Sequence, residues 1–383
     1  MASETSKTKE DVLQLLASSR EATKYWTEAL PTPSTSKSKT IIPSEQQLSN
    51  QIKASKLENP LGELAKLMKL IHAHATKLGL VFKPPIASTS FNACYQELET
   101  TSRTIILLVS LTRQLLDEVN LYSRLFVGEI TSQVKLLLSN FAGLTLELET
   151  SINEEKPEKE EQGEDQKAQG QDGRLVSVGK LWKSSDSLQE ITKLGSSGII
   201  KQKLKSNNQI IVDGYEEFEE WVKHPYSSKD DDDPFGLDDF SDDELDTEVS
   251  KDNAPTDTKP GLESDDDEQV DAELLDFAKK WLQKIKLIKL LVSSLDKSIP
   301  TSKYTVKFST GVDLLDTKRM KLGELVDDLI AAIIYEEDLE EAKSVSGSLS
   351  KETTKIVDIV KSLNNGDQKK SKWLDTWIIK FNE

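Results

Sequence analysis

The sequence has a single cysteine, Cys94, among 383 residues. One cysteine excludes an internal disulfide framework and any cysteine-rich zinc site. No apolar run approaches the roughly 18 residues that a membrane-spanning helix needs. The opening stretch MASETSKTKEDV lacks the apolar core of a secretory signal, and it is too acidic for a typical transit peptide. We therefore expect an intracellular protein in a reducing compartment.

Catalytic and metal-binding patterns are also missing from the sequence. It contains no P-loop, dinucleotide fingerprint, zincin motif or nucleophile elbow. Its three histidines are His72, His74 and His224, and the first two stand two residues apart, so on a helix they point to different faces and cannot share a metal. Cys94 has no histidine near it in the sequence and is expected to be a small buried hydrophobe. The sequence thus predicts no enzyme, no cofactor and no metal.

Acidic residues are concentrated in two stretches. The net charge is −18, of which −17 lies between Lys229 and Glu273 and −5 between Asn153 and Gly173. The remainder is close to neutral, so we expect no direct binding to nucleic acid, which needs a basic surface. The acids of the longer stretch do not fall at the offsets of a calcium-binding loop. Composition predicts an acidic linker at 153–173 and an acidic disordered segment at 226–270.

Apolar residues recur every three or four positions, which predicts helices almost throughout. One helix is expected over about 9–30, and another opens at Asn59-Pro60 and stops at Lys83-Pro84-Pro85. Ser88 or Ser90 could cap the next. The stripes expected to face the core are Leu15, Ala22, Trp26 and Ala29; Leu61, Leu64, Met68, Ile71, Ala75 and Leu78; Ile105, Leu108, Thr112, Leu115 and Val119; and Phe126, Ile130, Val134, Leu137, Phe141 and Leu144.

Helical spacing continues after the first acidic stretch. A helix with Leu175, Val178, Trp182, Leu188 and Ile191 on one stripe is expected to break at Gly195 to Gly198, and a further helix runs to about His224. Beyond the second acidic stretch, a 4-3-4-3-4-3 pattern predicts the narrow seam of a bundle. That seam comprises Leu274, Ala278, Trp281, Ile285, Ile288, Val292 and Leu295. Two more helices follow, one around Leu322 to Ile333 and one ending in Trp373, Trp377 and Phe381.

These patterns predict an all-α fold, with about nine helices in antiparallel bundles joined by acidic disordered linkers. The predicted divisions are an N-terminal bundle over 1–152, a central helical pair over 174–225, and a C-terminal helical region over 271–383 that packs on the bundle. Two short stretches, Arg113 to Leu116 and Ser123 to Phe126, match the letters of a cyclin-docking peptide. Because they lie within predicted helices with apolar residues on the core stripe, we interpret both matches as chance.

The middle of the chain resembles the cyclin-D-binding protein family, also known as the GCIP family of cyclin-D-interacting proteins. The stretch Val178 to Leu188, which includes Trp182 and Asp186, is similar to that family's Gly-x-Val-Trp-x-x-x-Asp-x-Leu helix. The family also has an acidic-aromatic run, here ending at Trp221, an acidic spacer, here around Phe235, and a Lys/Leu-rich helix, here around Trp281. The resemblance covers about 174–295 and marks a fungal-like or otherwise divergent member.

The resemblance implies a non-catalytic adaptor for protein partners, with cyclin-like or helix-loop-helix regulators as the expected class. It implies a negative role in cell-cycle progression or transcription, and a location in the cytoplasm and nucleus. The acidic stretch favours an alternative, an acidic chaperone or decoy for basic proteins such as histones. Three serines in that stretch, Ser228, Ser241 and Ser264, each have a carboxylate three residues later, which is the pattern of acid-directed kinases.

Overall fold

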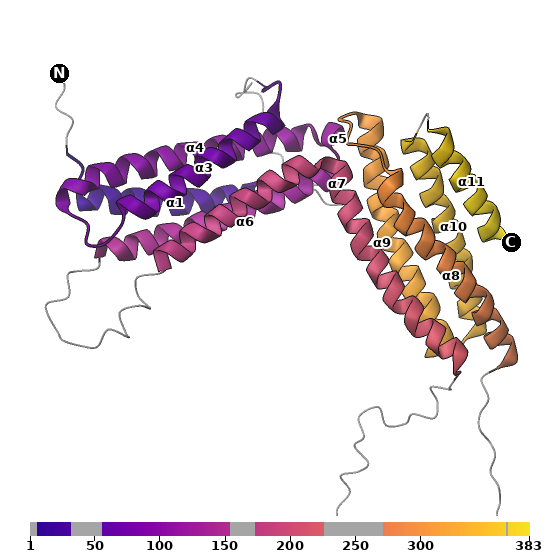
Figure 1. Ribbon diagram of the computed structural model, residues 1–383. Helices are drawn as coiled ribbons and strands as arrows, with labels where there is room; N and C mark the ends of the chain where they lie inside the picture. Colours follow the sequence, from indigo (N-terminus) through magenta and orange to yellow (C-terminus); the bar gives the residue numbers. More distant parts are fainter. Residues whose placement is uncertain (1–5, 32–55, 154–172, 226–270, 365–366) are drawn as a thin grey trace, which may run out of the picture. The chain divides into compact units, whose positions relative to one another are not determined.

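The computed structural model describes residues 6–31, 56–153, 173–225, 271–364 and 367–383 (Figure 1). Within these residues the chain forms ten α-helices and one short 3-10 helix, with no strand. The predicted all-α fold is confirmed, and the helix number is close to the nine expected. Ser228, Phe235, Ser241, Ser264 and most of the two acidic stretches lie outside the described residues, so the predictions made for them stay predictions.

The chain divides into two compact units, and each is described by itself. Unit 1 comprises Met1–Lys203 and Ile299–Thr317, and unit 2 comprises Leu204–Ser298 and Lys318–Glu383. Two long helices, α7 (Gly173–Lys223) and α9 (Val306–Ile334), contribute residues to both units. The domain boundaries expected from the sequence remain predictions.

Unit 1 is built on α1 (Lys9–Ala29), α3 (Pro60–Val81), η1 (Ser88–Ser90), α4 (Phe91–Asp117), α5 (Val119–Tyr122), α6 (Arg124–Asn153) and the first part of α7. Helix α1 packs against α4 and α6, and α3 packs against α4. The Asn59 side chain accepts the Gly62 backbone N–H at 3.0 Å, with Pro60 in the first helical position, so α3 begins as predicted.

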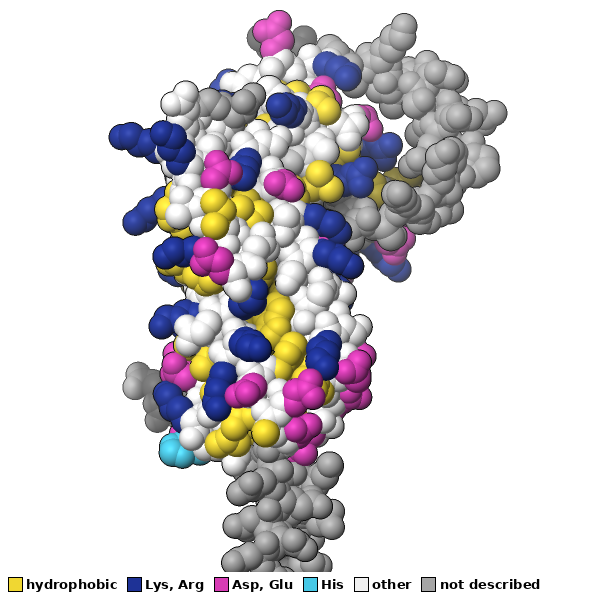
Figure 2. Space-filling model, turned by 90° about the vertical axis from the view of Figure 1, so that its right-hand side faces the viewer, with side chains coloured by type: hydrophobic (Ala, Val, Ile, Leu, Met, Phe, Trp, Pro, Cys, Tyr) yellow, Lys and Arg dark blue, Asp and Glu magenta, His cyan; other side chains and the backbone are white. Residues whose placement is uncertain are grey.

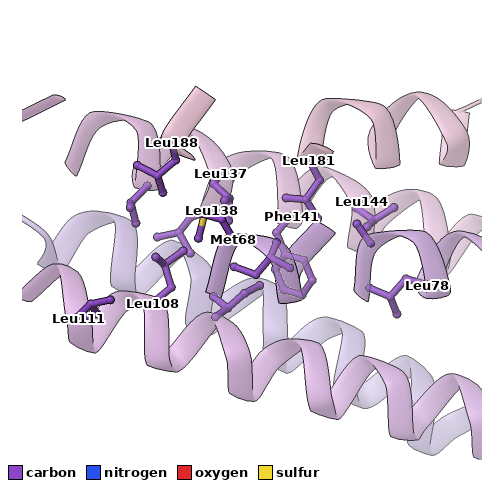
Figure 3. Close-up of a cluster of buried hydrophobic side chains, with 14 of the residues drawn as sticks. Met68, Leu78, Leu108, Leu111, Leu137, Leu138, Phe141, Leu144, Leu181 and Leu188 are labelled. Carbon is purple, nitrogen blue, oxygen red and sulfur yellow. The ribbon is translucent and has the colours of Figure 1, made fainter. Parts of the chain in front are cut away.

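The core of unit 1 is formed by leucines and other apolar side chains from α3, α4, α6 and α7 (Figure 3). The stripe predicted for α6 is buried in full, and the stripe predicted for α3 is buried except for the half-buried Leu61. In α4, Ile105, Leu108, Thr112 and Leu115 are buried. Burying such stripes stabilises the unit at roughly 25 cal/mol per Å² of apolar surface removed from water.

The buried face of helix α1 is displaced from the predicted stripe, of which Leu15, Ala22 and Trp26 are half-buried. Its buried residues are Val12, Leu16, Ser19 and Thr23, whereas Ala29 is exposed. The two hydroxyl residues tolerate burial because they are hydrogen-bonded: Thr23 donates to the Ser19 carbonyl at 2.7 Å, and the Ser19 and Ser102 hydroxyl oxygens lie 3.1 Å apart. A stripe chosen by apolar residues alone misses a face that includes small polar ones.

The break predicted at Gly195 to Gly198 is a kink inside α7, and helical residues resume directly after it. Gly195 has φ 60° and ψ −175°, a conformation that essentially requires glycine. The backbone N–H of Ser197 donates to the Ser302 hydroxyl at 2.9 Å, and the Ser197 hydroxyl donates to the Pro300 carbonyl at 2.7 Å. The chain after α8 thus supplies the hydrogen-bond partners that the kink requires.

Unit 2 contains the rest of α7, α8 (Ala272–Ser298), most of α9, α10 (Leu339–Leu363) and α11 (Gln368–Asn382). All seven residues of the seam predicted in α8 are buried, as are Leu322, Val326, Leu329 and Ile333 of α9. The sequence predicted one helix where α10 and α11 stand. The break follows from Asp367, whose carboxylate accepts the Lys370 backbone N–H at 3.2 Å and caps α11.

Candidate interaction surfaces

The positions that carry the family resemblance differ in burial. Leu188 is fully buried in the core of unit 1, and Trp221 and Trp281 are 1% and 7% exposed in unit 2. Trp221 also stacks against Phe218, with ring centroids 6.5 Å apart. A side chain that is enclosed in this way stabilises the fold and offers little to a partner. These three residues are therefore packing positions.

Trp182 and Asp186 lie at the surface of unit 1, one helical turn apart on α7. The Trp182 indole N–H donates to the His72 carbonyl at 3.2 Å, and its ring stacks on the His72 ring with centroids 5.0 Å apart and planes at 10°. Trp182 is half-buried by this contact with α3, and Asp186 is exposed. Of the described family-motif positions, these two are the ones that a partner could touch.

Small residues and one amide fix the position of α7 on the neighbouring helices. A side chain at Gly79 of α3 would place its Cβ 3.1 Å from Val178, so glycine permits the close approach of α3 and α7. On the other side, the Asn140 side-chain amide of α6 donates to the Ser184 hydroxyl at 2.6 Å. These contacts orient α7 so that Asp186 is exposed and Trp182 is half-buried against α3.

Leu175 extends this outward surface, although the sequence placed it on the core stripe. Leu175 and Val176 are 52% and 53% exposed, so that prediction was wrong for Leu175. Leu175, Trp182 and Asp186 follow the helical spacing of seven and four residues and share one side of α7. We call these three residues the α7 face. The sequence contained a sign that this prediction was unsafe. Leu175 and Val176 are adjacent at the start of the helix, and one apolar stripe cannot bury two adjacent side chains.

The histidines and the cysteine have structural contacts. His74 Nδ1 lies 2.5 Å from the Glu97 carboxylate, while His72 stacks on Trp182, so the two imidazoles point to different partners as the spacing predicted. His224 is exposed just after α7. Cys94 is fully buried, as predicted, and its thiol donates to the Val81 carbonyl at 3.4 Å. Burial raises the pKa of Cys94 to about 11, so the thiol stays protonated at neutral pH and is a poor nucleophile.

The first cyclin-docking look-alike is helical, and so is the second from Arg124 onward, since Ser123 lies just before α6. Leu115 is buried in the last turn of α4, and Phe126 is buried in the first turn of α6. A docking peptide would have to be extended, with these side chains free, so the interpretation of both matches as chance agrees with the fold.

Among the described residues, no three or more His, Cys, Asp and Glu side chains come together as metal ligands would. No helix in this part of the chain combines the length and the apolar character needed to cross a bilayer.

The part of the sequence that forms these surfaces matches a known protein family. The sequence model described as "Grap2 and cyclin-D-interacting, N-terminal" matches residues 63–224, from the first turn of α3 to the end of α7. The match includes Trp182, Asp186, Leu188 and Trp221. It also extends into α3, α4 and α6, where the sequence alone gave a helical pattern but no motif.

Two relatives match along most of their length. The uncharacterized protein YLR287C of Saccharomyces cerevisiae is 31% identical over 329 residues, which cover 85% of this chain and 86% of the relative. The uncharacterized protein C22E12.18 of Schizosaccharomyces pombe is 24% identical over 331 residues, covering 84% and 85% of the two chains. From the family match and the first of these relatives, we conclude that this chain belongs to the family of Grap2 and cyclin-D-interacting proteins.

Proposed function

We propose that this protein is a non-catalytic regulatory adaptor that acts by binding protein partners. Its family is named for interaction with cyclin D, and this supports cyclin-like or helix-loop-helix regulators as the partner class. In this proposal the adaptor restrains cell-cycle progression or transcription, and it works in the cytoplasm and nucleus.

One observation connects the proposed partner binding with a particular surface of the protein. Within the matched region, Leu188 and Trp221 are buried, whereas on α7 Asp186 and Leu175 are exposed and Trp182 is half-buried. An exposed leucine, an anchored tryptophan and a carboxylate combine apolar contact area with a charge that can orient a partner. Tryptophan is also enriched among residues that dominate binding energy. We therefore assign partner binding to the α7 face.

The test is a binding measurement with purified full-length protein and the purified cyclins and helix-loop-helix regulators of its own cells. The variant Leu175→Asp/Asp186→Lys should weaken binding of the true partner by at least about tenfold, the effect of losing about 1.4 kcal/mol. Both side chains are exposed, so the fold should persist. Replacing the gene by this variant should also shift the fraction of cells in each cell-cycle phase, and removal of the gene should shift it in the same direction.

The matched control is Leu107→Asp/Asp117→Lys on α4. Leu107 is 57% exposed and the Asp117 side chain is 56% exposed, so the control makes the same chemical changes on another exposed surface of unit 1. It should leave binding within about twofold of wild type. If none of these regulators binds, or if both variants bind as the wild type does, the assignment is wrong.

The alternative function, an acidic chaperone or decoy, has its own support in the −17 net charge between Lys229 and Glu273. Binding of this kind depends on long-range charge, and salt screens it within about 8 Å at physiological ionic strength. The affinity of a decoy for histones should fall steeply between low and moderate salt concentration. Deletion of residues 229–270 should abolish the binding. An apolar contact at the α7 face should depend on salt much less.

A further inference from the structure

Helix α8 of unit 2 has an outward stripe opposite its buried seam. The exposed residues of this stripe follow the spacing of three and four, and they are Lys279, Gln283, Lys286, Leu290, Ser293 and Lys297. Leu290 is 54% exposed, and Leu287 beside it is half-buried. These two leucines lie with Lys286 and Lys289 at a surface hollow of about 540 Å³. The stripe therefore combines positive charge with an apolar depression.

Helix α11 packs beside α8 and adds a second surface of the same character. The Trp377 indole N–H donates to the Leu287 carbonyl at 2.9 Å, and the Lys284 ammonium donates to the Phe381 carbonyl at 2.7 Å, so the two helices are firmly joined. The outward side of α11 has three exposed lysines and two exposed apolar side chains. These residues are Lys369, Lys372, Lys380, Trp373 and Ile379.

We call the outward residues of α8 and α11 together the α8–α11 face. Figure 2 views unit 2 from this side and shows hydrophobic side chains in small groups between Lys and Arg side chains. Residues 279–297 of α8 contain six Lys and one Asp, and residues 368–382 of α11 contain four Lys and one Asp. This positive balance stands out in a protein whose net charge is −18.

We propose that the α8–α11 face binds an acidic amphipathic segment of a partner protein, whose apolar side chains enter the hollow at Leu290 and whose carboxylates meet the surrounding lysines. The proposal goes beyond the function proposed above, because it concerns unit 2 and not the α7 face. Complementary charge would orient such a segment and speed its association, and the leucines and Trp373 would supply apolar contact.

The composition of the face favours a protein segment over nucleic acid. Neither stretch contains arginine, the residue that recognises phosphate in a bidentate way. One carboxylate, Glu219 near the end of α7, lies close to the face: hydrogen bonds from Lys223 and Tyr215 lower its pKa most, and the charges of Lys223 and Lys286 contribute less. A peptide with spaced carboxylates and apolar anchors would fit.

The experiment uses the full-length protein and a defined probe. The probe is a 20-residue fluorescein-labelled peptide with Leu and Phe on one helical face and Glu on the other, and binding is followed by fluorescence anisotropy. The variants Lys286→Glu/Lys372→Glu and Leu290→Glu should each weaken binding by at least about tenfold, the first by reversing the attraction and the second by placing a charge in the hollow. A probe with Ser in place of Leu and Phe should bind as weakly.

The matched control, Lys205→Glu/Lys351→Glu, makes the same change of charge at exposed lysines of α7 and α10. It should change binding by less than about twofold. An equal loss in the control would mean unspecific attraction and overturn the proposal. So would tighter binding of a DNA oligonucleotide or of anionic lipid vesicles than of the probe. If the probe binds only after deletion of 229–270, the occupant is the protein's own acidic stretch, and the assignment to a partner is wrong.

Discussion

Gly195 is the residue on which the shape of α7 depends. Its positive φ strains any other residue, and a Cβ there would lie 2.6 Å from the Ser302 hydroxyl oxygen. We predict that Gly195→Ala lowers the free energy of unfolding by about 2 kcal/mol or more. Urea denaturation followed by circular dichroism measures this. The control is Gly179→Ala in the same helix, where nothing lies within 4 Å; it should be neutral or stabilise by up to about 1 kcal/mol. Equal effects at both positions would contradict the kink.

Cys94 offers a second test at the scale of one residue. Burial raises its pKa from 9.0 to about 11, so the folded protein holds the thiol proton more tightly than the unfolded chain. The stability gained in this way is present below pH 9 and is lost as the pH rises towards 11. At pH 8 a thiol reagent should label the native protein at least about a hundredfold more slowly than the urea-unfolded chain, because the thiolate fraction falls by that factor. Comparable labelling rates would mean an accessible thiol.

At the scale of one element, α8 determines how unit 2 is packed, because its seam is buried from Leu274 to Leu295. Ile285 is fully buried, and Ile285→Asp would leave a carboxylate among apolar side chains. We predict a loss of more than about 3 kcal/mol in the free energy of unfolding, seen as a lower melting temperature. Gln283→Asp, two residues earlier and exposed, is the control and should cost less than about 1 kcal/mol. An unchanged melting temperature for Ile285→Asp would place that face in solvent.

At the scale of the whole molecule, the charge is distributed so that one stretch holds almost all of the net −18. We predict that an acid-directed kinase phosphorylates Ser228, Ser241 and Ser264, each addition contributing about −1.5 to −2 charges. The added charge should strengthen binding to basic proteins at low salt. Intact mass spectrometry of protein from its own cells, followed by peptide mapping, measures the modification. Finding Ser241 and Ser264 unmodified in both growing and arrested cells would end this hypothesis.

Much of the fold follows from local sequence. The stripes of α3, α6 and α8 were predictable because helical spacing brings apolar residues to one side, and that side must be buried for the helix to persist. The start of α3 was equally local, since Asn59 and Pro60 act within one turn. The division of the last region into α10 and α11 was missed, because the cap at Asp367 is a weaker sign than the apolar spacing on either side of it.

The surfaces depended on tertiary structure. Leu175 and Leu188 were predicted on one stripe, yet Leu188 is enclosed in the core and Leu175 is 52% exposed. At 3.6 residues per turn the two side chains lie on different sides of α7, and the neighbouring helices decide which of those sides is covered. Ser19 and Thr23 are buried because Ser102 and a backbone carbonyl satisfy their hydroxyls, and Ser102 comes from a distant part of the chain. The sequence by itself determined most of the helices and the apolar sides of α3, α6 and α8. Packing between helices decided which of those sides remained open to a partner. Such packing depends on contacts between distant parts of the chain, and no local sequence pattern contains them.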